Sequence, residues 1–291
     1  MSFLRHIERC NNYRPQEFVP LRVDGEPTGR VRPAFARELL RHGEVFGGDA
    51  GEGLDLLPVA ADRTDAVASV VADLARRHRV QPPLGEWYPV TRGGRDEALF
   101  LVDRSMASWF GFRTFGQHLN GYLRRGDELL MWIGRRASDR RLFPGRLDQL
   151  VAGGLPHGVS LEENLAKECY EEAGIGPGLA AQAVFTGSVT YFAQTEKGAK
   201  PDELFCYDLE LDEAFEPRCT DGEVEAFHLM PVTEVMEIVR TSDAFKPNCS
   251  LVVLDFLLRH GVLGPHEPDF EGVRRGLRMP LDESRGFSAT R

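Results

Sequence analysis

Three glutamates in the middle of the 291-residue chain, Glu168, Glu171 and Glu172, have the spacing of a metal-binding group. In an α-helix with about 100° per residue, positions i, i+3 and i+4 fall on one face. Carboxylates this close raise one another's pKa unless water or a cation lies between them. Oxygen ligands at this density suit Mg²⁺ or Mn²⁺. The alternative is a solvated acidic helix face, the more common outcome for clustered glutamates.

The residues around these glutamates predict a helix with defined ends. Ser160 and Glu163 have the spacing of a capping box, so the helix should begin just after Ser160, and Gly174 is placed to end it. A separate apolar stripe, suited to packing on a core, is formed by Leu165, Cys169 and Ala173. The stretch in front, from residue 153, is expected to be a glycine loop.

Basic side chains near this helix are candidates for holding an anionic substrate, since the chain has a net charge of −10. Arg135 and Arg136 end a predicted strand, and Lys167 directly precedes the first metal glutamate. Arginine suits bidentate contact with phosphate. Because side chains alternate along a strand, at most one of Arg135 and Arg136 should reach the site.

A second group of candidates lies on the strand expected after Phe112. Arg113, His118 and Asn120 are expected to share one face of that strand and could contact the ring of a ligand. The alternative, more common for His and Asn in a strand, is a hydrogen bond satisfied within the sheet.

The elements that position these residues form two units and a tail. Residues 1–110 show short strand and helix patterns, including an amphipathic run over 63–78, and predict an accessory α+β domain. Residues 111–263 alternate strands and helices around the glutamate helix, while 264–291 should hold a short helix near 271–278 and a frayed end. The predicted fold class is α+β, a sandwich of a mixed sheet between helices preceded by the accessory domain.

Composition excludes several classes of protein. The net charge of −10 argues against broad binding to nucleic acid, which requires a basic surface. The five cysteines are scattered and lack CxxC spacing, which indicates reduced thiols. No run approaches the roughly 18 apolar residues of a membrane helix, and no signal-peptide pattern opens the chain. We therefore expect a cytoplasmic location and no membrane partner.

The stretch from Gly153 to Ile175 resembles the Nudix box: a glycine, five residues, a glutamate, seven residues, and then R-E-U-x-E-E-x-G-U, where U is aliphatic. The matching positions are Gly153, Glu168, Glu171, Glu172, Gly174 and Ile175. Val159 stands where the early glutamate is expected, Lys167 replaces the arginine and Cys169 replaces an aliphatic residue. The three glutamates that resemble the family's metal ligands are all present.

The flanking segments make the resemblance narrower. Several flanking segments are similar to the thiamine pyrophosphokinase-related Nudix hydrolases of plants and fungi. They are FGFRTFGQHLNGYL, LFCYDLEL and DGEVEAFHLMPV, and in the front domain RTDAVASVV and EWYPVT. This resemblance implies a Nudix-type α/β/α sandwich and metal-dependent cleavage of a diphosphate linkage. The implied substrate is thiamine diphosphate or its oxidised derivatives, cleaved to the monophosphate plus phosphate. No transit segment precedes the front domain, so a plastid address is not expected.

The same resemblance implies roles for individual residues. Glu168, Glu171, Glu172 and a backbone carbonyl at Gly153 would hold Mg²⁺ or Mn²⁺. Glu223 resembles a late glutamate that many Nudix enzymes bring to the metals, so the implied catalytic carboxylates are Glu171, Glu172 and Glu223.

Other functions stay open. The chain could hydrolyse another (nucleoside) diphosphate compound, or it could be a Nudix module that binds without cleaving. An isomerase similar to isopentenyl diphosphate isomerase shares the fold, but the runs HLNGYL and MWIGRRA lack the cysteine such an enzyme requires. The expected partner is a small-molecule diphosphate, and a homodimer is also allowed.

Overall fold

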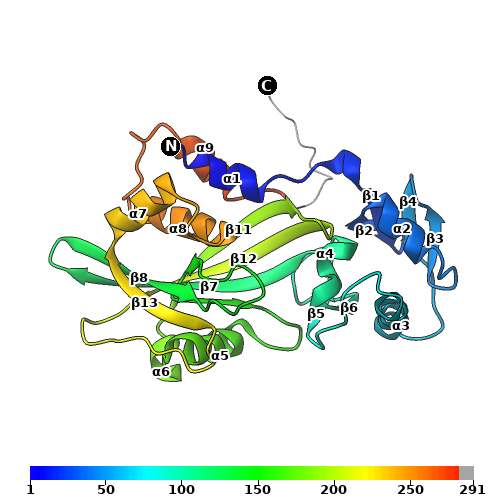
Figure 1. Ribbon diagram of the computed structural model, residues 1–291, viewed down its shortest axis with the longest axis horizontal. Coiled ribbons are helices and arrows are strands. Elements are labelled where there is room, and N and C mark those ends of the chain that lie inside the picture. Colours follow the sequence, from blue (N-terminus) through cyan, green and yellow to red (C-terminus); the bar gives the residue numbers. More distant parts are fainter. Residues whose placement is uncertain (282–291) are drawn as a thin grey trace.

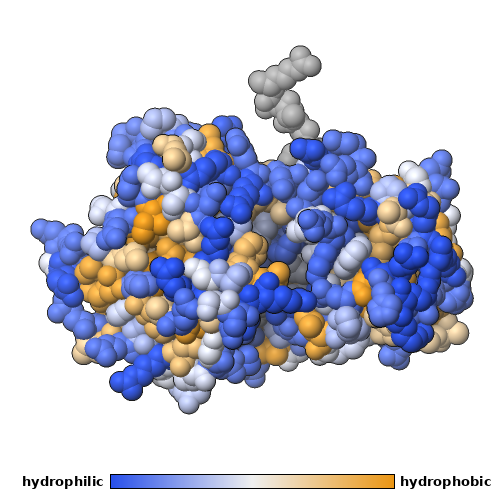
Figure 2. Space-filling model, viewed as in Figure 1, coloured by the Kyte–Doolittle hydropathy of each residue, from blue (hydrophilic) through white to orange (hydrophobic). Residues whose placement is uncertain are grey.

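The computed structural model describes residues 1–281, which form a large unit built on one sheet and a smaller unit beside it (Figure 1). Hydrophilic residues predominate on the face of the molecule shown in Figure 2, and apolar residues form only small patches there. None of the helices in residues 1–281 is long and apolar enough to cross a membrane.

The larger unit is organised around a seven-stranded sheet. Its main strand order is β11-β12-β7-β8-β13, with β10 paired to β7 and β9 paired to β8. Strands β12 and β7 are parallel and the other pairs are antiparallel, so the expected mixed sheet is confirmed. The strands are β7 (Thr114–Arg125), β8 (Glu128–Arg136), β9 (Leu147–Asp148), β10 (Val151–Gly154), β11 (Val184–Gln194), β12 (Ala199–Glu210) and β13 (Val224–Pro231).

Helices cover both faces of this sheet, as the predicted sandwich requires (Figure 1). One face carries α5 (Leu161–Ala173) and α6 (Pro177–Ala180). The other carries α1 (Leu4–Cys10), α7 (Val232–Thr241), α8 (Pro247–Arg259) and α9 (Phe270–Gly276). Separate apolar clusters fill the two sides, and the one under α5 contains its predicted stripe of Leu165, Cys169 and Ala173. The short helix expected in the tail is α9, and the predicted frayed end lies outside the described residues from 282 onward.

The N-terminal helix α1 packs in the larger unit, although it precedes the accessory domain in sequence. Phe3, Ile7 and Cys10 are buried in the same apolar cluster as the side chains of α8. A helix of seven residues has too little apolar surface to fold alone, and α8 offers it a face. The larger unit therefore contains both the first and the last described helix of the chain.

The accessory unit has a four-stranded sheet, in the order β2-β1-β4-β3, and a separate hairpin of β5 and β6. Its strands are β1 (Val19–Val23), β2 (Glu26–Val31), β3 (Phe46–Asp49), β4 (Gly53–Leu56), β5 (Trp87–Val90) and β6 (Phe100–Asp103). Its helices are α2 (Pro33–Leu39), α3 (Arg63–Arg76) and α4 (Ala107–Phe110), with 3₁₀ turns η1 (Pro15–Glu17) and η2 (Arg104–Met106). The predicted amphipathic run is α3, whose N-cap Asp62 accepts a hydrogen bond from the Thr64 amide. After the hairpin of β5 and β6, the chain passes through η2 and α4 into β7 of the larger unit.

Candidate active site

Helix α5 begins and ends where the sequence predicts. Ser160 Oγ accepts a hydrogen bond from the Glu163 amide at 3.1 Å, and Glu163 Oε2 accepts one from the Ser160 amide at 3.0 Å. Gly174 ends the helix with φ 66°, a left-handed conformation that favours glycine. These ends fix the position along the sheet at which the three glutamates project.

Glu172 is the most deeply placed of the three. Its side chain is buried, and Oε2 accepts a hydrogen bond from the Ala152 amide of β10 at 2.7 Å. Burial raises the pKa of Glu172 to about 8, the Ala152 hydrogen bond opposes this shift, and the carboxylates of Asp148, Glu168 and Glu223 add to it. Glu172 therefore lies within electrostatic range of three other acids.

This raised pKa predicts how the metal-free protein responds to pH. Between the ordinary value of 4.5 and about 8, folded Glu172 holds a proton that the unfolded chain has lost, so stability falls as pH rises through this window. In EDTA, we expect the melting temperature to drop by about 5 °C or more between pH 5 and pH 8. Glu172→Gln should flatten this dependence in differential scanning calorimetry. An equally steep slope in the variant would assign the pH dependence to other groups.

Glu168 and Glu171 share one ammonium group. Lys167 Nζ lies 3.2 Å from Glu168 Oε1 and 2.7 Å from Glu171 Oε2. Burial raises the pKa of Glu168, whereas the neighbouring Lys167 lowers it. Lys167, expected as a phosphate contact, is thus paired with the helix glutamates in this structure. Its position shows that one cation can form ion pairs with both carboxylates.

The expected glycine loop is wrong in its first part, because Gly153 and Gly154 are the last two residues of strand β10. A Cβ atom on Gly153 would lie 2.5 Å from Cδ of Glu168, and one on Gly154 would lie 2.1 Å from the Tyr88 hydroxyl. The glycines leave room for α5 on one side of the strand and for the accessory domain on the other.

Gly153→Ala is expected to displace the Glu168 carboxylate, because the new methyl group would occupy its place. We expect the affinity for Mn²⁺, measured by calorimetric titration, to fall by about tenfold or more, the loss of roughly one charge-assisted contact. Gly178→Ala is the matched control, since a Cβ there meets nothing within 4 Å. Equal Mn²⁺ affinities in the two variants would show that Glu168 does not need this space.

A loop docked on the end of α5 leads to Glu223. The amide of Thr220 donates to the carbonyl oxygen of Glu171 at 2.7 Å, and the amide of Arg218 donates to that of Ala173 at 3.0 Å. Asp221 Oδ1 then accepts a hydrogen bond from the Glu223 amide at 2.9 Å. These contacts tie the start of β13 to the helix that carries the glutamates.

Glu223 lies close enough to the helix to raise the pKa of both Glu168 and Glu172. Its carboxylate pairs with the Arg140 guanidinium at 2.7 Å and is about one-third exposed. The structure therefore groups Glu223 with the helix glutamates.

His118 and Asn120 lie on the face of the sheet covered by α8, opposite α5. His118 Nδ1 is 2.7 Å from Gln149 Oε1, and Asn120 Nδ2 donates to Asp208 Oδ1 at 3.0 Å. Both residues are buried, and burial lowers the pKa of His118 to about 4. His118 Nδ1 and Asn120 Nδ2 thus bond to neighbouring side chains below α8, whereas the buried Asn120 Oδ1 has no hydrogen-bond partner within residues 1–281.

Arg113 does not share a face with His118 and Asn120, so that expectation is wrong. It precedes β7, and five positions, an odd number, separate it from His118. Arg113 Nη1 donates to the Gly93 carbonyl at 2.9 Å and lies 3.8 Å from Glu203 Oε2. It therefore links the two units.

Arg135 and Arg136 have different partners, as their alternation predicts. Arg135 Nη1 donates to the Gly145 carbonyl at 3.2 Å. Arg136 is largely buried, and its Nη1 donates to Asp148 Oδ2 at 3.1 Å. Both side chains thus hold the segment between β8 and β10 in place.

A polar cluster under α8 is compact enough to hold a cation but already has its own. Potential ligand atoms of His118, Asp148 and Cys249 lie within 4.8 Å of one another. Arg136 and Lys246 both pair with the Asp148 carboxylate, Lys246 at 3.4 Å. Two protein cations at one carboxylate disfavour a metal ion there, so we interpret the cluster as an internal ion network.

The accessory domain holds the segment between β10 and α5, a role that sequence analysis missed. Arg95 Nη2 donates to the carbonyl oxygens of Pro156, at 2.8 Å, and Val159, and the arginine side chain is only 9% exposed. The Trp87 carbonyl accepts a hydrogen bond from the His157 amide at 2.8 Å. No local pattern links these residues, because they are about 60 positions apart.

Arg104 of η2 brings a further positive charge to the end of β10. Its guanidinium pairs with Glu86 at 2.8 Å and lies 5.8 Å from the centre of the Tyr88 ring. Its Cζ is 3.3 Å from the position of a Cβ on Gly154. The accessory domain thus reaches the strand that carries the first glycine of the box.

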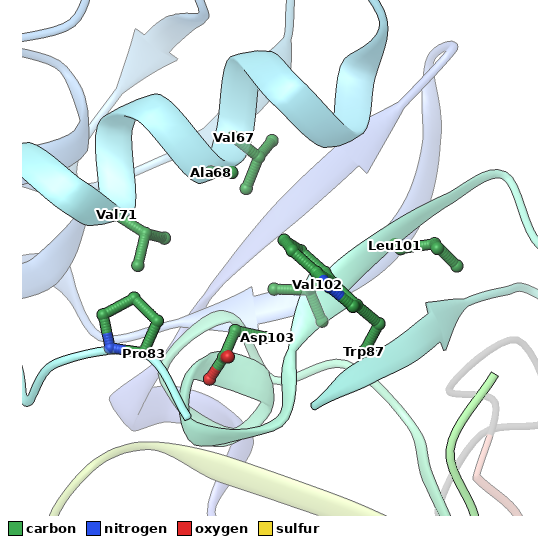
Figure 3. Close-up of a pocket in the computed structure, with 8 residues that line it drawn as sticks. All are labelled: Val67, Ala68, Val71, Pro83, Trp87, Leu101, Val102 and Asp103. Carbon is green, nitrogen blue, oxygen red and sulfur yellow. The ribbon is translucent and has the colours of Figure 1, made fainter. Parts of the chain in front are cut away.

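The accessory domain also has a small apolar pocket, shown in Figure 3, between α3 and β6. The Trp87 ring and the side chains of Val67, Val71 and Val102 line it. Its volume of about 30 Å³ is that of about one water molecule. Asp103 at its border already accepts three backbone hydrogen bonds and the other lining side chains are mainly apolar, so the pocket offers an organic ligand few polar contacts and little space.

Two family descriptions match the chain in succession. Residues 2–114 match "Domain of unknown function (DUF4743)", and residues 119–249 match "NUDIX domain". Among solved structures, that of a C. elegans Ap4A hydrolase binary complex covers 52% of this chain and 99% of its own, with 12% identity and a TM-score of 0.38.

Two plant relatives extend the similarity over nearly the whole chain. Arabidopsis thaliana Nudix hydrolase 24, chloroplastic, is 39% identical over 284 residues, which are 95% of this chain and 78% of the relative. Nudix hydrolase 20, chloroplastic, from the same plant is 38% identical with the same coverage. The expected cytoplasmic location is contradicted by these relatives, because both are named as chloroplastic.

The glutamates of α5, the sheet that supports them and the accessory domain in front all lie within this shared region. Identity of this level over most of both chains settles the family, and the activity it carries is hydrolysis of pyrophosphate-containing substrates. The chain belongs to the Nudix hydrolases.

Proposed function

We propose that this Nudix hydrolase is metal-dependent and cleaves a small organic diphosphate to a monophosphate and phosphate. Thiamine diphosphate and its oxidised derivatives are the first candidate substrates, on the resemblance of the flanking segments. The observation that carries the metal dependence is the convergence of Glu168, Glu172 and Glu223: the Glu223 carboxylate raises the pKa of both helix glutamates, and Glu168 also raises that of Glu172.

The donor set fits Mg²⁺ or Mn²⁺. Every side chain in it is a carboxylate, and hard divalent cations prefer oxygen ligands. Glu168 and Glu171 already share the positive charge of Lys167, and a divalent ion would replace or join that ammonium group. Glu168, Glu171 and Glu172, with a backbone carbonyl at Gly153, would hold the ion. When bound, it would neutralise phosphate charge and make a bound water more acidic.

The chain's own residues would perform the remaining steps. Glu223 accepts a proton from the attacking water at its carboxylate, while the water oxygen bonds to phosphorus and the bridging P–O bond breaks. Thr220 and Asp221 hold the Glu223 segment against α5 through the contacts described above. Arg95 holds the segment before α5, so that the helix and the substrate keep a fixed relation.

Phosphate release from a panel of diphosphates, with Mg²⁺, with Mn²⁺ and in EDTA, tests this function. The panel includes thiamine diphosphate, its oxidised derivatives, ADP-ribose and a nucleoside diphosphate. We expect the highest kcat/KM on thiamine-type diphosphates and a return to background in EDTA. Full activity in EDTA would refute the metal dependence, and preference for a nucleoside diphosphate would refute the substrate assignment.

A further inference from the structure

Three segments that are distant in sequence meet at one side-chain amide. Gln81 follows α3 in the accessory domain, Arg141 lies in the connection from β8 to β9, and Lys197 lies in the turn between β11 and β12. Gln81 Oε1 accepts hydrogen bonds from Arg141 Nη1, at 3.3 Å, and from Lys197 Nζ, at 2.7 Å. Two positive charges are thus held on one neutral oxygen.

These two cations have no acidic partner in the described part of the chain. Within residues 1–281, neither Arg141 nor Lys197 lies within ion-pair distance of a carboxylate, although the chain is rich in acids. Arg141 lowers the pKa of Lys197, after the larger effect of burial, as expected for like charges brought together. The buried Nε2 of Gln81 also has no hydrogen-bond partner in this part of the chain. The group therefore presents hydrogen-bond donors and positive charge in excess.

Packing fixes this arrangement in place. A Cβ on Gly198, the residue after Lys197, would lie only 2.1 Å from the Ser108 carbonyl oxygen, so the turn lies directly against α4. Figure 1 shows the end of the β11–β12 hairpin reaching α4 of the accessory domain. A surface lysine on a free turn would move away from a like charge, whereas this turn is held.

The same connection that carries Arg141 also contacts the glutamate cluster. Arg140 pairs with Glu223, and the Ala137 amide donates to the Glu223 carbonyl at 2.9 Å. Neighbouring residues of one short segment thus contact an acid of the cluster on one side and the accessory domain on the other. A diphosphate bound at the glutamates needs positive charge for phosphate oxygens that a metal ion does not cover.

We propose that Arg141 and Lys197, joined by Gln81, form an anion subsite that binds a phosphate group of the substrate. This inference rests on the proposed diphosphatase function and adds a substrate contact from outside the Nudix box. The subsite exists only where the two units meet, which gives the accessory domain a direct part in substrate binding.

The subsite is tested by calorimetric titration of the full chain with inorganic pyrophosphate in EDTA, where no turnover interferes. We expect the double variant Arg141→Ala/Lys197→Ala to bind pyrophosphate at least about tenfold more weakly than the wild type, the loss of charge-assisted hydrogen bonds. The double variant Arg124→Ala/Arg125→Ala, on the distant β7–β8 hairpin, removes the same charge and should keep wild-type affinity. Absence of pyrophosphate binding to the wild type, or equal losses in both variants, would overturn the proposal.

Gln81→Glu separates ligand binding from a purely structural bridge. A carboxylate of nearly the same shape would pair with both cations and cancel one of their two positive charges, so the junction should remain folded and its melting temperature should be unchanged or higher. Pyrophosphate affinity should nevertheless fall by about tenfold or more. A structural bridge alone predicts unchanged pyrophosphate affinity in this variant, a result that would refute the subsite.

Failure of the subsite can be told apart from failure of the diphosphatase function. If the subsite alone is wrong, wild-type turnover of the diphosphate panel persists and KM is unchanged in Arg141→Ala/Lys197→Ala. If the diphosphatase function alone is wrong, no panel compound is cleaved, yet pyrophosphate binding still depends on Arg141 and Lys197.

Discussion

Replacing Glu172 with glutamine is expected to lower kcat for diphosphate hydrolysis by about 10²- to 10³-fold, the range typical for loss of one group that stabilises transition-state charge. Glutamine keeps the shape of the side chain and can still accept the hydrogen bond from the Ala152 amide. It removes the negative charge that a divalent ion requires. Stability in EDTA should not fall, because burial already favours the neutral form of Glu172.

Glu162→Gln is the matched control for this experiment, because Glu162 lies in the first turn of the same helix and is exposed. Its kcat should stay within about twofold of the wild type. Glu171→Gln should lower kcat as Glu172→Gln does, and its stability should also stay close to that of the wild type, since Glu171 is about one-third exposed. Wild-type rates in Glu172→Gln, measured by phosphate release at saturating Mg²⁺, would refute the metal-ligand assignment.

Replacing Arg95 with alanine is expected to lower kcat by about 10- to 100-fold, although Arg95 lies in the accessory domain. Its guanidinium holds two carbonyl oxygens of the segment before α5, and hydrogen bonds from a charged group are worth about 1.5–3 kcal/mol each. Without them, the segment can move and α5 no longer keeps one position relative to β10. Hydrogen exchange at residues 155–160 should rise in the variant.

Free guanidinium ion, at concentrations well below those that unfold the protein, should restore part of the lost activity of Arg95→Ala, since it can refill the space of the deleted group. Arg92→Ala is the matched control, because Arg92 also donates to a carbonyl, that of Val23, but stays within the accessory domain. Equal losses in the two variants, without rescue by guanidinium, would show a general loss of stability rather than a positioning role for Arg95.

The features that could be predicted best from the sequence are those set by neighbouring residues, such as helix ends and helix faces. The ends of α5 follow from Ser160, Glu163 and Gly174, and its two faces follow from helical periodicity, so all of these agree with the structure. The position of Gly153 in a strand could not be predicted in this way. A glycine pair before a cap typically indicates a loop, and only packing of Glu168 and Tyr88 on both sides explains the strand.

Residues that act across the junction were beyond local prediction. Arg95, Gln81 and Lys197 have no periodic pattern and no nearby motif, and their partners lie about 60 to 120 positions away. Arg113 was misplaced because an odd separation from His118 was interpreted as a shared face, whereas alternation along a strand puts residues at odd separations on opposite faces. Val159 was an indirect sign that another residue holds the segment between β10 and α5. An aliphatic side chain at this position cannot form the hydrogen bonds that Arg95 supplies instead.

Because α1 packs against α8, the accessory domain is an insert: it lies between two parts of the chain that belong to the larger unit. The chain starts in the larger unit with Phe3, Ile7 and Cys10, passes through the accessory domain, and returns to the same unit at β7. A fragment cut at residue 110 would leave the apolar surface beneath α1 open to water. Because both ends of the insert are anchored in one body, its residues at the active site are held there by the path of the chain itself.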